Sequence, residues 1–118
     1  MTRVLIVEDE PLIAMMLEDF LDVLDHQHAG TADTVADALA RIAAGGIDVA
    51  ILDVNLRGGE TSFPIADALD AKNIPFVFAS GGSGDGIDEA HRGRPQLTKP
   101  FTIDSVRLAL QDIARTRA

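Results

Sequence analysis

The chain has no cysteine and few basic residues, with 10 Lys and Arg against 19 Asp and Glu and a net charge of −9. The lack of cysteine excludes a disulfide framework, a thiolate zinc site and thiol catalysis. An acidic surface repels phosphate backbones, so we expect no direct contact with nucleic acid. No apolar run is long enough for a membrane span, and no signal peptide opens the sequence. We therefore expect a cytoplasmic protein that does not enter a membrane.

The chain does contain enough apolar residues to build one core. Its 118 residues are typical of a single domain, and 47% of them are hydrophobic. No low-complexity linker and no internal repeat divides the sequence. We expect one domain over residues 1–118, with no effector domain attached.

Short apolar runs alternate with longer amphipathic stretches. Residues 4–7, 49–52 and 76–79 are apolar without interruption. Such runs are typical of central strands in a parallel sheet that helices cover on both faces. Residues 28–31 and 96–98 are shorter, more polar strand candidates. Apolar residues recur at helical spacing over residues 12–24, 35–42, 65–69 and 103–113, where Pro11 and Thr102 suit helix starts and Gly45-Gly46 a helix end.

This alternation predicts an α/β fold with five parallel strands and a doubly wound sheet. The segment 81–93 contains five of the ten glycines, so any fourth helix between the last two strands should be weak or short. Ligands of such folds bind beyond the carboxyl ends of the strands, and the residues at those ends are therefore the candidates for function.

Acidic residues follow two of the predicted strands. Glu8-Asp9-Glu10 comes after the first strand, and Asp53 ends the third. Carboxylates that converge on one edge are costly unless a cation lies among them. Oxygen ligands without His or Cys favour Mg²⁺ over zinc or copper. The alternative is that the triplet only caps the following helix, which does not account for Asp53.

A hydroxyl and an ammonium group follow the remaining strands. Ser80 follows the fourth strand, and Lys99-Pro100 follows the fifth. A metal, a cation and a hydroxyl around an aspartate are the parts of a phosphoryl-transfer site with the aspartate as nucleophile.

Three motifs in this order resemble the receiver domain of two-component response regulators. They are Val4-Leu5-Ile6-Val7-Glu8-Asp9-Glu10, Ile51-Leu52-Asp53-Val54-Asn55-Leu56 and Leu97-Thr98-Lys99-Pro100-Phe101. The resemblance covers essentially the whole chain. It implies a flavodoxin-like five-stranded sheet in the order 2-1-3-4-5.

The resemblance also implies residue roles. Asp53 would accept the phosphoryl group, and Asp9 would bind Mg²⁺ directly, with Glu8 assisting through water. Asn55 would offer its backbone carbonyl to the metal. Two further residues would contact the phosphoryl group, namely Ser80 through a hydrogen bond and Lys99 through its charge.

The chain departs from the family pattern at several positions. Ser80 replaces the commoner Thr, and Gln96 stands where an aromatic residue is usual. The Phe-Ala-Ser-Gly sequence and the glycine-rich segment are similar to an atypical subgroup, known as the FAT GUY type, whose members are mostly stand-alone domains. The aromatic residue that closes the subgroup motif is replaced by Gly82-Ser83.

The resemblance implies a stand-alone response regulator. A histidine kinase or phosphotransfer protein would donate the phosphoryl group, and output would be contact with another, unidentified protein. We expect self-phosphorylation and autodephosphorylation but no enzymatic turnover, and residues 81–93 are the candidate moving part. One alternative is a pseudo-receiver that never takes phosphate. Another is a haloacid-dehalogenase-type phosphatase, which Asn55 disfavours because an amide cannot serve as the general acid/base.

Overall fold

Five parallel strands form one sheet in the order β2-β1-β3-β4-β5. The computed structural model describes residues 2–56, 59–80, 96–98 and 101–116. The strands are β1 (Arg3–Val7), β2 (Gln27–Ala32), β3 (Val49–Asp53), β4 (Phe76–Ser80) and β5 (Gln96–Thr98). The predicted flavodoxin-like strand order is confirmed, and all five predicted strands are present.

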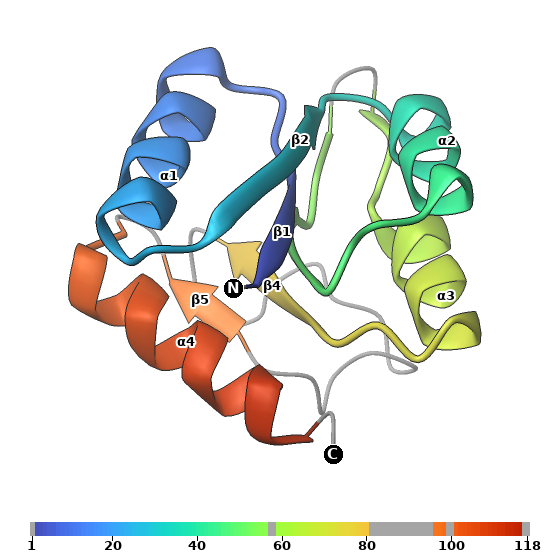
Figure 1. Cartoon of the computed structure of the whole chain (residues 1–118). Coiled ribbons are helices and arrows are strands. Elements are labelled where there is room, and N and C mark those ends of the chain that lie inside the picture. Colours follow the sequence, from blue (N-terminus) through green and yellow to red (C-terminus); the bar gives the residue numbers. More distant parts are fainter. Residues whose placement is uncertain (1, 57–58, 81–95, 99–100, 117–118) are drawn as a thin grey trace.

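Helices cover both faces of the sheet. The four within the described residues are α1 (Pro11–Val23), α2 (Val35–Ala44), α3 (Phe63–Ala71) and α4 (Ile103–Thr116). Figure 1 shows α1 and α4 on one side of the sheet and α2 and α3 on the other. No described helix is long and apolar enough to cross a membrane. The prediction of a weak helix over residues 81–93 concerns residues outside the described ranges and stays a prediction.

The central strands are apolar throughout because each face of the sheet has its own core. Alternate residues of a strand point to opposite faces. On β1, Leu5 and Val7 belong to the cluster beneath α2 and α3, whereas Val4 and Ile6 belong to the cluster beneath α1 and α4. All four of these side chains are at most 1% exposed. The uninterrupted apolar runs therefore form central strands that helices cover on both faces, as the sequence pattern predicted.

Local signals position the helix ends. Pro11 occupies the first turn of α1, and the Thr34 hydroxyl accepts a 3.1 Å hydrogen bond from the Asp37 N–H at the start of α2. Gly45 ends α2 with φ +86°, a conformation that favours glycine. The Thr102 hydroxyl accepts a 3.0 Å hydrogen bond from the Ser105 N–H at the start of α4. The ends at Pro11, Gly45 and Thr102 confirm the predicted ones, whereas the cap at Thr34 was not predicted from the sequence.

Candidate functional site

The site begins with two adjacent strands whose carboxyl ends carry acids. Val7 of β1 pairs with Leu52 of β3 in the parallel register. Glu8 and Asp9 directly follow Val7, and Asp53 directly follows Leu52. Pairing of the two strands therefore brings the acids to one edge of the sheet, as the sequence predicted.

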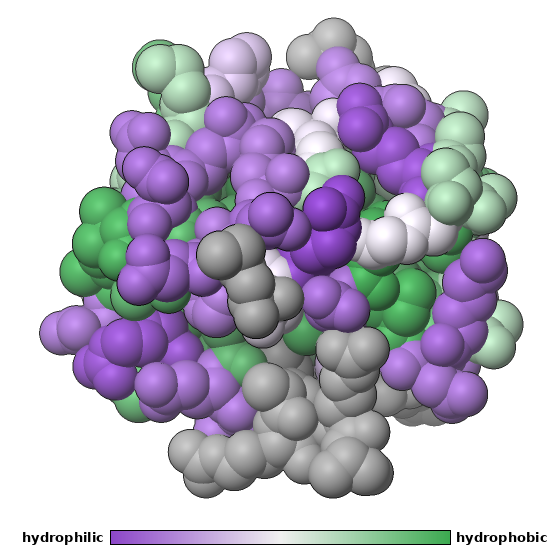
Figure 2. Space-filling model, in the orientation of Figure 1, coloured by the Kyte–Doolittle hydropathy of each residue, from purple (hydrophilic) through white to green (hydrophobic). Residues whose placement is uncertain are grey.

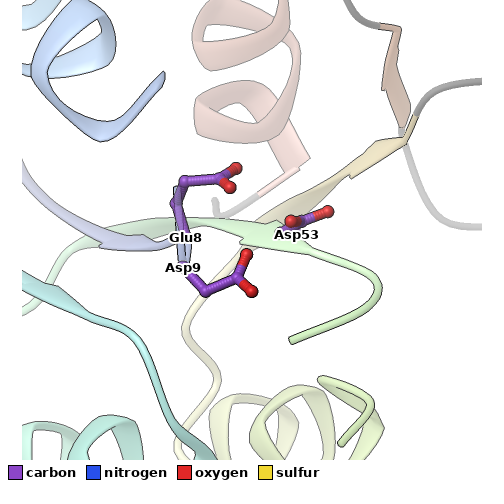
Figure 3. Close-up of side chains that lie close together, drawn as sticks. All are labelled: Glu8, Asp9 and Asp53. Carbon is purple, nitrogen blue, oxygen red and sulfur yellow. The ribbon is translucent and has the colours of Figure 1, made fainter. Parts of the chain in front are cut away.

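Three carboxylates gather at this edge. Glu8, Asp9 and Asp53 each offer one oxygen atom, and these atoms all lie within 4.8 Å of one another. Figure 3 shows the side chains clustered at the ends of their two strands. Glu8 is 3% and Asp53 is 9% exposed, and Asp9 is partly buried. Carboxylates this close repel each other, and burial makes the repulsion stronger than in water. The arrangement could hold a metal ion, and its all-oxygen donor set fits Mg²⁺.

Helix capping alone does not explain the acidic triplet. Glu10 is the N-cap residue of α1, but its side chain makes no capping hydrogen bond. Glu8 instead accepts a 3.1 Å hydrogen bond from the Glu10 N–H at Oε1, and its own N–H donates to the Ala32 carbonyl at 3.0 Å. These bonds fix the backbone at the end of β1, so that Glu8 is held beside Asp53.

The connection after Asp53 folds back on itself. The Val54 N–H donates to the Ala79 carbonyl at 3.3 Å, which ties it to the end of β4. Asn55 then pairs with Thr61 in an isolated antiparallel bridge, and its side chain is exposed. The bridge holds the Asn55 backbone in a hairpin directly after β3, and its predicted contact with a metal stays a prediction.

For Ser80 and Lys99 the structure describes at most the backbone, so the predicted roles of the hydroxyl and the ammonium group stay predictions. Ser80 is the last residue of β4, and its backbone pairs with Thr98 of β5. The preceding residue, Ala79, pairs with Asp53, so the Ser80 backbone lies at the same edge as the acids. Lys99 lies outside the described residues, and its predicted role stays a prediction.

The structure also reveals a pocket that the sequence analysis missed. It has a volume of about 430 Å³ and is lined by Glu8, Asp9, Pro11, Ala14, Met15, Glu18, Thr31 and Asp33. Thr31 donates a 3.0 Å hydrogen bond to Glu18, and His28 Nε2 lies 2.6 Å from the Thr31 hydroxyl. No local motif marks these residues, because only the packing of α1 against β2 brings them together.

Some apolar side chains of α1 reach the surface of the molecule. Leu12 is 79% and Met15 is 57% exposed. Ile13, Met16 and Phe20 are partly buried and pack against the core. On the face shown in Figure 2, hydrophobic areas lie on the left, at the level of the lower end of α1, and on the right, and the area between them is mainly hydrophilic.

Taken together, the sheet order and the edge cluster define a flavodoxin-like α/β protein whose acids could hold a cation. Residues 4–111 match the family model of the response regulator receiver domain. The chain belongs to this family, as its three motifs predicted.

Several known proteins are similar to this chain. The solution structure of SdrG from Sphingomonas melonis Fr1 is 66% identical, covers 97% of both chains and gives a TM-score of 0.87. The receiver domain of PhyR from Erythrobacter litoralis is 32% identical over 97% of this chain and 90% of its own, with a TM-score of 0.84. The transcriptional regulatory protein TcrA from Mycobacterium tuberculosis is 34% identical over 96% of this chain and 46% of its own. The chain spans half or less of the length of the curated relatives that it matches.

Proposed function

We propose that this receiver domain accepts a phosphoryl group on Asp53 in a Mg²⁺-dependent reaction and signals through contact with another protein. The observation that carries the proposal is the cluster of Glu8, Asp9 and Asp53, whose oxygen atoms lie within 4.8 Å of one another. A histidine kinase or phosphotransfer protein would be the donor. The domain would turn over no substrate other than its own phosphoryl group.

The reaction would be a transfer from a phosphohistidine. An Asp53 carboxylate oxygen attacks phosphorus, a P–O bond forms, and the P–N bond breaks with its electron pair returning to the imidazole of the donor. Asp9 and Asp53 would hold the metal, together with the backbone carbonyl of Asn55, and Glu8 would assist through water. A bound Mg²⁺ neutralises charge that develops on the phosphoryl oxygens. Ser80 and Lys99 would contact those oxygens once the group is attached.

A similar protein supports this proposal. SdrG from Pseudomonas melonis Fr1 has a solution structure in a BeF3-activated conformation. Its sequence is 68% identical to this chain, the match covers 92% of both chains, and the TM-score is 0.81. A beryllium fluoride complex has the tetrahedral shape of a phosphoryl group. A site that takes such a complex in SdrG favours the phosphoacceptor over a pseudo-receiver here.

Labelling with a small phosphodonor tests the proposal. Incubation with acetyl phosphate and Mg²⁺ should add the mass of one phosphoryl group to the wild type, and Asp53→Asn should abolish the gain. Asp22→Asn, which removes an exposed acid from α1, should be labelled like the wild type. Lack of labelling of the wild type would identify a pseudo-receiver. Continuous hydrolysis of phosphate esters would identify a phosphatase.

A further inference from the structure

Glu60, in the connection from β3 to α3, bonds to two other parts of the chain. Its side-chain Oε1 accepts a 3.1 Å hydrogen bond from the N–H of Val35, the first residue of α2. Its backbone carbonyl accepts a 2.7 Å hydrogen bond from the N–H of Leu56. Glu60 therefore links the segment that follows Asp53 to the first residue of α2.

The segment that Glu60 holds is a short antiparallel ladder. Besides the Leu56 bond to Glu60, the Ser62 N–H donates to the Val54 carbonyl at 3.0 Å, and Asn55 and Thr61 form a bridge between these two bonds. The flanking side chains of Val54 and Leu56 are 1% and 5% exposed. The residues on either side of Asn55 are therefore fixed by a ladder hydrogen bond and by burial of their side chains, which limits the freedom of the Asn55 backbone.

The bond to Val35 gives this ladder a rigid anchor. The first N–H groups of a helix have no partner within the helix, and a carboxylate near them gains from the helix dipole. At α2, the Thr34 hydroxyl accepts from the Asp37 N–H, and Glu60 accepts from the Val35 N–H. The Glu60 side-chain oxygen therefore ties this ladder to the first turn of α2.

We propose that Glu60 is a positioning residue for the metal site. By anchoring the ladder to α2, it holds the backbone of Asn55 in the place where its carbonyl can meet a cation bound by Asp9 and Asp53. This inference rests on the proposed Mg²⁺-dependent function. Glu60 touches neither the phosphoryl group nor the metal in this scheme, and its effect passes through the ladder.

The test compares two replacements of Glu60. Glu60→Ala removes the acceptor, whereas Glu60→Gln keeps an amide oxygen that can accept from Val35 but removes the charge. Mg²⁺ affinity would be measured by titrating isotope-labelled protein and following backbone amide shifts by NMR. We expect Glu60→Ala to weaken Mg²⁺ binding about tenfold, the lower end of what residues behind metal ligands contribute. Glu60→Gln should restore most of the affinity, and the Leu56 amide should exchange faster with solvent in Glu60→Ala alone.

Two control variants separate positioning from other effects. Thr34→Ala removes the other capping bond of α2 without touching the ladder, and Asp22→Asn removes one exposed acid elsewhere. Both should bind Mg²⁺ like the wild type. Equal weakening by Thr34→Ala would show that general loosening of α2 is the cause and would overturn the inference.

The remaining outcomes are also decisive. Wild-type affinity in Glu60→Ala would overturn the inference and leave the proposed function intact. Equal weakening in Glu60→Gln and Glu60→Ala would show that the charge acts at a distance, which also overturns positioning through the ladder. If the wild type itself bound no Mg²⁺, the proposed function would be wrong and the inference would fall with it.

Discussion

A carboxylate oxygen of Asp53 lies within 4.8 Å of a carboxylate oxygen of Asp9, although Asp53 ends β3 and Asp9 lies in the connection after β1. Parallel pairing of β1 with β3 produces this approach, because it aligns the carboxyl ends of both strands. Two negative charges at this separation repel each other, and Glu8 beside them adds a third. The like charges therefore raise the electrostatic energy of this edge, and a bound cation would lower it.

The first prediction concerns stability without metal. Asp53→Asn should raise the free energy of unfolding of the metal-free protein by about 1–3 kcal/mol, because it removes one charge from a buried cluster. Urea denaturation in the presence of a chelator measures this. Asp22→Asn should change the value little. A fall in stability of Asp53→Asn would contradict the proposed repulsion.

Mg²⁺ should stabilise the wild type in the same assay. A ligand that binds only the folded state adds about 2.7 kcal/mol at a concentration one hundred times its Kd. Asp9→Asn should lose most of this gain because it removes a proposed metal ligand. Sodium chloride of matched ionic strength is the control for general screening, and an equal effect of sodium would exclude a specific site.

Ser62 provides a prediction about packing. Its hydroxyl is buried, and Oγ has no hydrogen-bond partner among the described residues. A buried hydroxyl without a partner costs about 1–3 kcal/mol, so Ser62→Ala should raise the free energy of unfolding by about 1 kcal/mol. The backbone bond from Ser62 N–H to Val54 is unaffected by the substitution.

Ser105→Ala is the matched control for Ser62→Ala. The Ser105 hydroxyl donates to the Thr102 carbonyl at 2.9 Å and accepts from the Thr102 N–H at 3.0 Å. Its removal should lower stability by about 0.5–1.5 kcal/mol. If both serine variants lost stability equally, the Ser62 hydroxyl would have a partner after all.

The lowered pKa of His26 predicts that the free energy of unfolding depends on pH. Burial lowers its pKa from the ordinary value of 6.5, and Asp25 opposes the change. As the pH falls through 6.5, the unfolded chain takes up the proton before the folded protein does. This residue therefore contributes stability that is present above pH 6.5 and is lost as the pH falls toward the lowered pKa.

Substitution of His26 should remove that contribution. His26→Gln should lose less stability than the wild type when the pH is lowered from about 7.5 to about 5.5, a window set on both sides of the ordinary histidine pKa. Thermal unfolding across the window, with both proteins in the same buffers, measures the difference. Parallel curves would exclude His26 as a source of the pH dependence.

Much of the fold was predictable because its signals are local. The runs at residues 4–7 and 49–52 are apolar on both faces, and only strands between two helical layers need that pattern. Pro11 and Thr102 marked helix starts through backbone chemistry that depends on a few neighbouring residues. The exposure of the apolar side chains on α1 could not be predicted from the sequence. Periodicity shows which side of a helix is apolar but not how far a neighbouring element covers that side.

The sequence by itself determined the strands, the helix starts and the acids at the strand ends, because each depends on residue types within one or two turns of chain. Only the tertiary structure decided which of these acids meet, since the pairing of β1 with β3 sets the separation of Asp9 and Asp53. It also decided the role of Glu60, whose bond to Val35 joins residues 25 apart in sequence. Contacts between distant segments follow from how the layers pack, and no short motif carries that information.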